Sequence, residues 1–310
     1  MANVLAHIAL GILLAAQAKA DTPGCHAELI DSLPITFAGF VPAIHVTVNG
    51  HAVAMGIDTG AQATMVTPAG AEYLGLAKDA LHETKIVGGA GTTKVGRVFL
   101  EKLEIGTSIS RQHMSVSAIS LVLPKTELPD GKKVVGLVGM DVLKDFEIEF
   151  DAAGGKFSLY KLAGACTDFK PAWQGPFIGV KATISPTGRF TMPVEIDGHR
   201  VMAIFDSGAQ RMRIAHDAAV PDLVSQSALE KDSLADVNGA GVASLKVFRH
   251  EFKYIRIGNE AFPKPKMDVA GFPPTEGGLL LGEDFMQSRR FWLSPARNII
   301  FVQNPAALKK

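Results

Sequence analysis

Several residue types and patterns are scarce in this 310-residue sequence, and each scarcity excludes a class of function. Lysine plus arginine and aspartate plus glutamate both number 31, so no basic surplus exists to neutralise phosphates, and we expect no nucleic-acid partner. The apolar run at 8–16 is about half the length of a membrane-spanning helix, so we expect no membrane span. HExxH, GxSxG, Walker and complete GxGxxG motifs are missing, which argues against metal, serine and nucleotide chemistry. The sequence therefore predicts neither a metal nor a cofactor.

The first 20 residues have the pattern of a secretory signal peptide. The apolar run is followed by Ala18-Lys19-Ala20, the small-x-small pattern that signal peptidases cleave. The region before the run is poor in positive charge, which leaves a buried N-terminal helix as the alternative. We predict a signal peptide at 1–20 and a secreted or periplasmic protein.

Only two cysteines are present, Cys25 and Cys166. An even pair in an exported protein permits one disulfide, which would tie the N-terminal arm to the segment between two domains. Two unpaired buried thiols are the alternative, because sequence alone does not tell whether the residues come within bridging distance.

Length and composition indicate two all-β domains. A chain of 310 residues exceeds one comfortable hydrophobic core, and its 47% apolar content suffices for two. The 31 glycines and 17 prolines are spread along the chain, as expected for many short strands joined by tight turns. We therefore expect an all-β fold.

The sequence repeats a β-hairpin that ends on an acid. Apolar runs flank Asn49-Gly50 in the first half and Asp197-Gly198 in the second, and such dipeptides are typical of type I′ hairpin turns. Nine positions after Asn49 and after Asp197 come Asp58 and Asp206, each followed by a hydroxyl residue, glycine and alanine. Each acid is thus predicted at the far end of a hairpin's second strand.

Three further landmarks recur in the same order at offsets near 148, which we interpret as an internal duplication. They are Gly-rich tips at 88–91 and 238–241, Ile-Gly pairs at 105–106 and 257–258, and apolar segments broken by glycine at 136–141 and 279–284. The last two segments end in Asp141 and Asp284, each of which is suited to cap a short helix. A repeat of this length is a whole domain, so we predict two lobes related by an approximate twofold axis. The predicted bounds are an N-terminal arm at 21–34, a first lobe at 35–161, a linker at 162–174 and a second lobe at 175–310.

Two acids at matched positions predict an active site. A twofold axis would bring the acidic loops together, and carboxylates in contact cannot both ionise, so Asp58 and Asp206 would share a proton. One could then deprotonate a water held between them, while its protonated partner donates to the scissile carbonyl. The alternative is that both acids belong to structural turns on opposite sides of the molecule.

The residues beside the acids have assignable roles. Thr59 and Ser207 carry hydroxyls able to bond across the interface, and Gly60 and Gly208 let the backbone pass where a Cβ would crowd the partner loop. The apolar residues before Gly139 and Gly282 would form a wall behind each acidic loop or be simple core strands. His51 and His199 also match between the halves, but they belong to hairpin turns and are expected to be solvated.

These motifs resemble those of the retropepsin-like and pepsin-like aspartic peptidases, in which an Asp-Thr/Ser-Gly-Ala loop and a later apolar-apolar-Gly segment define each lobe. The resemblance covers nearly all of the chain after residue 35, and it implies two β-barrel lobes, an active-site cleft between them and flap hairpins. It implies that Asp58 and Asp206 are catalytic and that the supporting loop residues are Thr59, Gly60, Ala61, Ser207, Gly208 and Ala209. The flap residues that it implies are Gly88, Gly89, Ala90, Gly91, Asn238, Gly239, Ala240 and Gly241.

The predicted function is that of an exported aspartic endopeptidase that acts on peptide or protein substrates, as a monomer because both half-sites lie on one chain. Ala61 and Ala209 stand where pepsin-like enzymes have hydroxyl residues that bond the acids, so we expect a less acidic pair and a weakly acidic pH optimum. A catalytically weak or inactive peptide-binding protein of the same fold is the alternative. Arg211 supports it if it points inward and holds Asp206 ionised, although a position on the rim is favoured.

Overall fold

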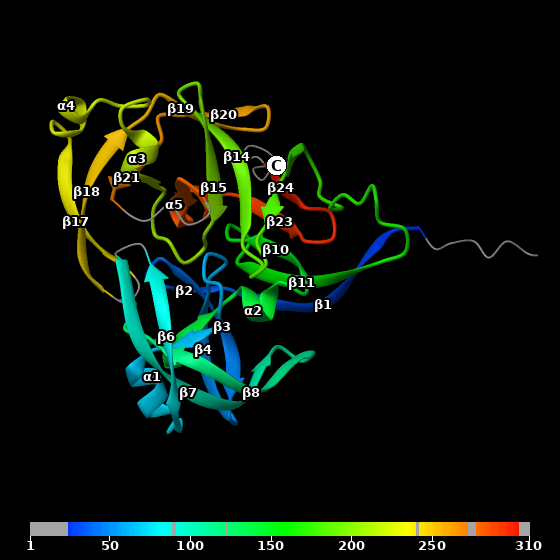
Figure 1. Cartoon of the computed structure of the whole chain (residues 1–310). Coiled ribbons are helices and arrows are strands. Elements are labelled where there is room, and N and C mark those ends of the chain that lie inside the picture. Colours follow the sequence, from blue (N-terminus) through cyan, green and yellow to red (C-terminus); the bar gives the residue numbers. More distant parts are fainter. Residues whose placement is uncertain (1–23, 89–90, 122, 240–241, 272–276, 304–310) are drawn as a thin grey trace, which may run out of the picture.

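The computed structural model describes residues 24–88, 91–121, 123–239, 242–271 and 277–303 (Figure 1). The predicted signal peptide at 1–20 lies outside these ranges, as do the flap residues Gly89, Ala90, Ala240 and Gly241, so these assignments stay predictions. Among the described residues, no helix combines the length and the apolar character that crossing a bilayer would need.

An eight-stranded sheet forms the first lobe. Its strand order is β2-β3-β4-β9-β5-β8-β7-β6, and an additional pairing of β3 with β7 curls it into a barrel-like shape. Two short helices belong to this half of the chain: α1 (Pro68–Tyr73) connects β5 to β6, and α2 (Met140–Leu143) follows β9. The strands are β2 (Thr36–Ala38), β3 (Val41–Val48), β4 (His51–Ile57), β5 (Met65–Val66), β6 (Lys78–Gly88), β7 (Gly91–Ile105), β8 (Ile109–Ala118) and β9 (Val134–Val138).

A ten-stranded sheet forms the second lobe in a matching arrangement. Its order is β17-β18-β21-β16-β22-β15-β14-β19-β20, and β13 pairs with β14. Its short helices are α3 (His216–Ala219), α4 (Gln226–Leu229) and α5 (Glu283–Met286). The strands are β13 (Thr183–Ile184), β14 (Phe190–Ile196), β15 (His199–Phe205), β16 (Arg213–Ala215), β17 (Ser233–Gly239), β18 (Val242–Glu251), β19 (Tyr254–Ile257), β20 (Glu260–Pro263), β21 (Lys266–Ala270) and β22 (Leu279–Leu281).

Equivalent residues of the two lobes are 148 positions apart in their central hairpins. Ala43 pairs with Gly56 between β3 and β4, and Thr191 pairs with Ile204 between β14 and β15. A third strand then runs parallel to the second strand of each hairpin, β9 beside β4 and β22 beside β15. The prediction of an all-β fold with two barrel-like lobes is confirmed.

A third sheet, which the sequence did not predict, joins the two halves. Its order is β1-β11-β10-β23-β24-β12, and the β10–β23 pairing connects a strand of the first half to a strand of the second. The predicted domain bounds separate strands that pair in this sheet, and they stay a prediction. The strands are β1 (His26–Pro34), β10 (Glu147–Asp151), β11 (Lys156–Ala163), β12 (Phe177–Lys181), β23 (Arg290–Ser294) and β24 (Ile299–Gln303).

The disulfide of Cys25 and Cys166 lies at the end of this sheet. Its Cα atoms are 4.7 Å apart, next to the β1–β11 pair formed by His26 and Ala163. Of the two alternatives left by the sequence, the structure therefore has the disulfide, which ties the N-terminal arm to the linker.

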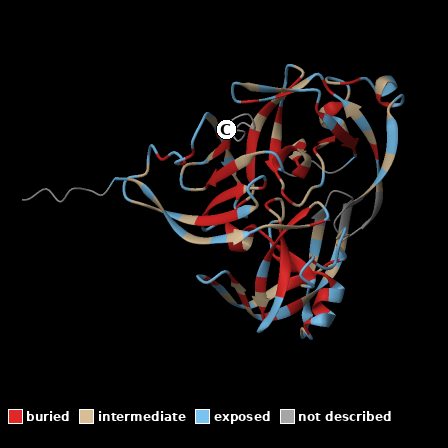
Figure 2. Cartoon of the chain, turned by 180° about the vertical axis from the view of Figure 1, so that it is seen from behind, coloured by how far each residue is buried: buried red, intermediate tan, exposed pale blue. Residues whose placement is uncertain are grey.

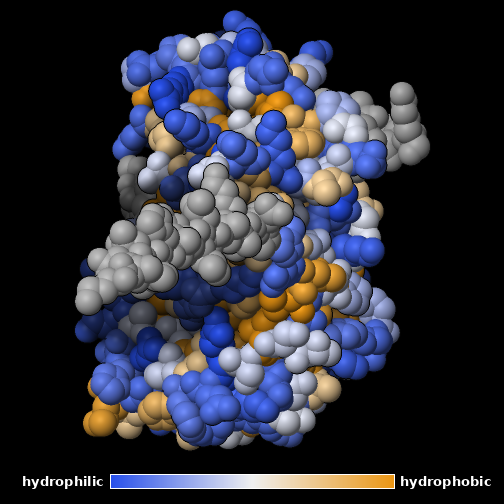
Figure 3. Space-filling model, turned by 90° about the vertical axis from the view of Figure 1, so that its right-hand side faces the viewer, coloured by the Kyte–Doolittle hydropathy of each residue, from blue (hydrophilic) through white to orange (hydrophobic). Residues whose placement is uncertain are grey.

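The hydrophobic core is continuous across all three sheets (Figure 2). Ile44 of the first lobe, Phe150 of the shared sheet and Phe205 of the second lobe are fully buried in one cluster. The face seen in Figure 3 is mostly hydrophilic, with hydrophobic residues gathered in small patches. Burial of apolar side chains thus holds the two lobes and the shared sheet together as one unit.

Candidate active site

Two tight hairpins deliver the acids to the junction of the lobes. Asn49 and Gly50 both have positive φ (49° and 83°), as do Asp197 and Gly198 (49° and 92°), which confirms the predicted type I′ turns. β4 and β15 then end directly before Asp58 and Asp206. The backbone N–H of each acid continues the pairing of its strand, donating to Val138 at 3.0 Å and to Leu281 at 3.1 Å.

Thr59 and Ser207 interlock the two acidic loops. The backbone N–H of each residue donates to the hydroxyl of the other at 3.1 Å. Each hydroxyl in turn donates across the interface to a backbone carbonyl, Thr59 to Phe205 and Ser207 to Ile57, both at 2.8 Å. Both side chains are buried, so the four hydrogen bonds are shielded from water and fix the loops relative to one another.

Glycine is required on each side of this interface. A Cβ on Gly60 would lie 2.4 Å from Cγ of Asp206, and a Cβ on Gly208 would lie 2.4 Å from Oδ2 of Asp58. Each loop thus packs its glycine against the acid of the other lobe. The structure therefore brings Asp58 and Asp206 together, as the sequence-based hypothesis requires; the catalytic roles of these and the supporting residues stay predictions.

The carboxyl groups of Asp58 and Asp206 interact directly. The pKa of Asp58 is raised to about 8, chiefly by burial and then by the charge of Asp206 and a hydrogen bond between the two side chains. The N–H groups of Ala61 and Gly60 act in the opposite direction and lower this pKa. Burial also raises the pKa of Asp206. The N–H groups of Gly208 and Ala209 donate to Oδ1 of Asp206 at 3.0 and 3.1 Å and favour its ionised form. Asp58 accepts the equivalent bonds from the N–H groups of Gly60 and Ala61 at 3.0 and 2.8 Å, so these backbone bonds are the same in both halves of the pair.

Two arginines of the second lobe lie near Asp206 and make its surroundings differ from those of Asp58. Arg213 in β16 and Arg189 just before β14 both carry positive charge near Asp206 and lower its pKa. The sequence had instead pointed to Arg211. The backbone of Arg211 packs against Gly282 at the start of α5, where its charge acts on Asp284 of that helix.

A third carboxyl group lies behind the acidic pair. Glu283 is only 2% exposed, and neither of its side-chain oxygens has a hydrogen-bond partner among the described residues. Burial, together with the charges of Asp206 and Asp284, raises the pKa of Glu283 to about 8. Glu283 is therefore neutral at neutral pH. Its counterpart after Gly139 in the first lobe is Met140, which carries no charge.

The glycines 139 and 282 cap the short helices that follow them. The sequence predicted Asp141 and Asp284 as caps, but the N-cap residues are Gly139 and Gly282. The carboxylate of Asp141 accepts from both the N–H and the hydroxyl of Thr64, and that of Asp284 accepts from the N–H of Met212. The aspartates thus fix the chain that follows each acidic loop instead of capping a helix.

The segments beside Asp58 form an apolar wall. Met65, Leu137 and Val41 pack in one cluster with Ala61 and with Ile86 of the β6 hairpin strand. Val138 and Leu281, the apolar residues that directly precede Gly139 and Gly282, are instead fully buried in the main core, which favours the core-strand alternative for them.

The described residues of the two predicted flaps lie at the ends of paired strands. Gly88 ends β6 and Gly91 begins β7, and Asn238 and Gly239 end β17 in the second lobe. β7 and β18 contact each other, on the left of Figure 1, where the two hairpins point toward one another.

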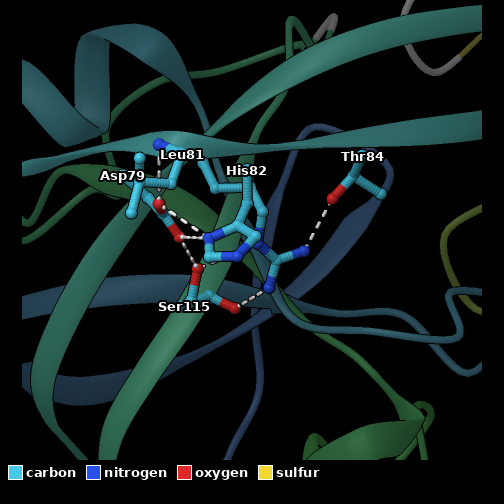
Figure 4. A network of polar contacts seen from close by, with 6 residues as sticks. Asp79, Leu81, His82, Thr84 and Ser115 are labelled. Atoms are coloured by element: carbon cyan, nitrogen blue, oxygen red, sulfur yellow. Dashed lines mark hydrogen bonds and ion pairs between the residues drawn. The ribbon is translucent and has the colours of Figure 1, made fainter.

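A polar network braces the base of the first flap hairpin (Figure 4). β6 bulges between Asp79 and Glu83, and the side chain of Asp79 accepts from the Leu81 N–H at 3.2 Å and from Ser115 at 3.0 Å and contacts His82 Nδ1 at 2.9 Å. Burial alone would raise the pKa of Asp79, but these hydrogen bonds outweigh it and lower that pKa. Arg97 of β7 extends the network, donating to Ser115 at 2.8 Å and to Thr84 at 2.6 Å.

Sequence reasoning missed Arg189, Arg213 and Glu283. The signal was available, because positions 148 apart are equivalent: Val41 corresponds to Arg189 and Met65 to Arg213. A position-by-position comparison of the halves would have found apolar residues replaced by arginines at both places.

Comparisons with known proteins show what parts of this chain are similar to. The aspartyl protease family matches residues 44–142, which include the first acidic loop and the first flap hairpin. DNA damage-inducible protein 1 from Chaetomium globosum is 33% identical over 121 residues, 37% of this chain and 24% of that protein. The protein of the same name from Cryptococcus neoformans var. neoformans is 34% identical over 106 residues, 33% of this chain and 21% of that protein.

This chain therefore spans about a quarter of the length of these curated relatives. Among solved structures, an aspartic proteinase from Irpex lacteus aligns with 90% of this chain and 98% of its own, at 12% identity and a TM-score of 0.49.

Proposed function

Because residues 44–142 belong to the aspartyl protease family, as the sequence motifs predicted, we propose that the chain is an aspartic endopeptidase in which Asp58 and Asp206 together activate one water. The observation that carries the proposal is the direct contact of these two acids across the interlocked loops. The substrate is a peptide or an exposed segment of a protein.

The two acids have different roles in the proposed reaction. The charges of Arg213 and Arg189 favour the carboxylate form of Asp206, which we assign as the general base. Asp58, whose pKa is raised by burial and by the charge of Asp206, carries the proton and is the general acid.

In the first step, Asp206 takes a proton from the water, whose oxygen attacks the scissile carbonyl carbon. The proton of Asp58 goes to the carbonyl oxygen, so a neutral gem-diol forms, Asp58 becomes the carboxylate, and the pair keeps its single negative charge. In the second step, Asp206 gives its proton to the amide nitrogen as the C–N bond breaks, and Asp58 regains a proton from a gem-diol hydroxyl. Both acids return to their starting state, and no covalent enzyme intermediate is needed.

We further propose that the protein is exported and active as a monomer. Support for export comes from the Cys25–Cys166 disulfide, because such bonds persist in oxidising compartments. Support for a monomer comes from the presence of both acids on one chain.

Substitution of each acid tests the proposed function. Asp58→Asn and Asp206→Asn should each abolish cleavage of a diverse peptide mixture analysed by mass spectrometry. Asp217→Asn is the matched control, because the Asp217 side chain is 91% exposed and lies outside the site. Equal product patterns from wild type and both dyad variants would refute the proposal and favour a peptide-binding protein without catalysis.

A further inference from the structure

The two walls of the site differ in charge, although they are built from equivalent positions. In the first lobe, Val41, Met65 and Leu137 form a buried apolar cluster beside the loop of Asp58, and the partly buried Ala61 and Ile86 pack against it. In the second lobe the equivalent positions are Arg189 and Arg213, beside the loop of Asp206. A substrate that fills both sides therefore meets an apolar wall on one side and two guanidinium groups on the other.

We propose that Arg213 binds a carboxylate of the substrate on the second-lobe side of the scissile bond, so that cleavage favours an acidic group there and an apolar residue on the first-lobe side. This proposal rests on the proposed peptidase function and names its substrate class. The carboxylate is either an Asp or Glu side chain or the free C-terminus of the substrate, and the experiment below distinguishes these sources.

Strand alternation directs Arg213 toward the acids. Successive side chains of a strand point to opposite faces, and Ile214, the next residue of β16, is fully buried in the main core. Arg213 therefore points to the face opposite the core, on which its charge reaches Asp206. Met65 likewise points away from the main core of the first lobe, because the next residue, Val66, lies in that core and Met65 lies in the apolar wall.

Arg213 faces two acids, the buried Asp268 and then Asp206 of the acidic pair. Its Nε is buried and forms no hydrogen bond within the described part of the chain. The nearest acid in register is Asp268 of β21, which is 1% exposed. Oδ1 of Asp268 lies 3.4 Å from Nε of Arg249, and its Oδ2 has no hydrogen-bond partner among the described residues, so Arg213 and Arg249 share one negative charge.

A buried guanidinium donor without an acceptor is costly, and a carboxylate is the ligand that best matches its planar set of donors. The acids that face Arg213 are Asp206 and Asp268, and only Asp206 belongs to the catalytic pair. A substrate carboxylate would add negative charge beside Asp206, and the positive charge of Arg189 on the same side helps to offset it.

Matched peptides test the proposal. Each pair of peptides differs at one position beside the scissile bond, where one member has Glu and the other its isostere Gln. The ratio of their kcat/KM values measures the preference for a carboxylate on that side of the bond. A second pair ends at the same position with a free carboxylate or an amide, which distinguishes a terminal carboxylate from a side chain. On one side only, wild type should favour the acidic member of a pair by about tenfold or more, as expected for a hydrogen bond to a charged group.

Variants assign that preference to Arg213. Arg213→Met, which introduces the residue of the first lobe, should reduce the Glu/Gln ratio to about one and still cleave the Gln peptide. Arg213→Lys should keep part of the preference, because a lysine retains the charge but not the forked geometry. Met65→Leu is the matched control in the first lobe and should leave the ratio as in wild type. An unchanged ratio in Arg213→Met would overturn the proposal.

A binding measurement separates failure of the subsite from failure of the proposed function. In the Asp58→Asn background, which should not cleave, the Glu peptide should bind about tenfold more tightly than the Gln peptide, and addition of Arg213→Met should remove the difference. If wild type cleaves no peptide but this binding difference is present, the peptidase function is wrong and the carboxylate subsite stands. Equal binding of the two peptides would refute the subsite whether or not the protein cleaves.

Discussion

Thr59 and Ser207 donate their backbone N–H groups to each other's hydroxyl at the same distance, 3.1 Å, although they are 148 residues apart in the chain. This reciprocal pair of hydrogen bonds fixes the position of one lobe relative to the other. Because the acids directly precede these residues, their separation depends on this pair of hydrogen bonds.

Removal of one hydroxyl should therefore lower both stability and activity. Thr59→Val keeps the shape of the side chain but leaves the Ser207 N–H and the Phe205 carbonyl without their partner. We expect a loss of about 1–3 kcal/mol in the free energy of unfolding, measured in urea, and a large fall in kcat. Thr59→Ser keeps the hydroxyl and should remain close to wild type. A Thr59→Val protein with wild-type stability and kcat would contradict this role.

Gly60→Ala should inactivate the site without a comparable effect elsewhere. The added Cβ would lie 2.4 Å from Cγ of Asp206, so the two loops must separate. The control is Gly96→Ala, because a Cβ on Gly96 would have nothing within 4 Å. We expect kcat/KM to fall by orders of magnitude only in Gly60→Ala, since misplacement of reacting groups by about 1 Å can cost about 100-fold. Equal activity of the two variants would argue against close packing of the loops.

The rate of peptide cleavage should depend on pH through both acids. Asp58 must be protonated, and its pKa is raised to about 8, so kcat/KM should fall as the pH rises through that value. Asp206 must be ionised, and its pKa is raised above 3.8, so kcat/KM should also fall on the acid side. The optimum should lie in the weakly acidic to neutral range. A profile that peaks at or below pH ~3 would be inconsistent with these roles.

Glu283 should make the fold less stable as the pH rises. Its pKa is raised from 4.5 to about 8, so the unfolded chain releases this proton first and unfolding becomes easier between these values. Glu283→Met, which introduces the residue of the first lobe, should leave stability near pH 4 almost unchanged and raise it by a few kcal/mol above pH ~8. Urea unfolding at several pH values measures this difference, and a gain that is independent of pH would point to packing instead of charge.

Local patterns were sufficient to predict the hairpins and the position of the acids. Asn49-Gly50 and Asp197-Gly198 permit positive φ at both central residues, and such turns fix the register of the strands that follow. The repeat then indicated that Asp58 and Asp206 are equivalent. Their contact required the approximate twofold axis, which follows from the repeat but not from either half alone.

The shared sheet and the arginines near Asp206 could not be predicted in the same way. The pairing of β10 with β23 joins strands about 140 residues apart, and no local motif selects a partner at that distance. Arg211 attracted attention because it is adjacent to the acidic loop in sequence, whereas Arg213 reaches Asp206 through strand alternation. The charge of Glu283 was overlooked because only tertiary burial changes its pKa.

The difference between Val41 and Met65 in the first lobe and Arg189 and Arg213 at the equivalent positions of the second lobe has a consequence for specificity. In a homodimer with one acid per subunit, every mutation appears on both sides of the symmetry axis, so neither side can acquire a charge alone. A single chain encodes the two sides separately, so selection can change one of them and leave the other intact. Point mutations on one side can therefore give such a site a preference for one orientation of the bound polypeptide over the other.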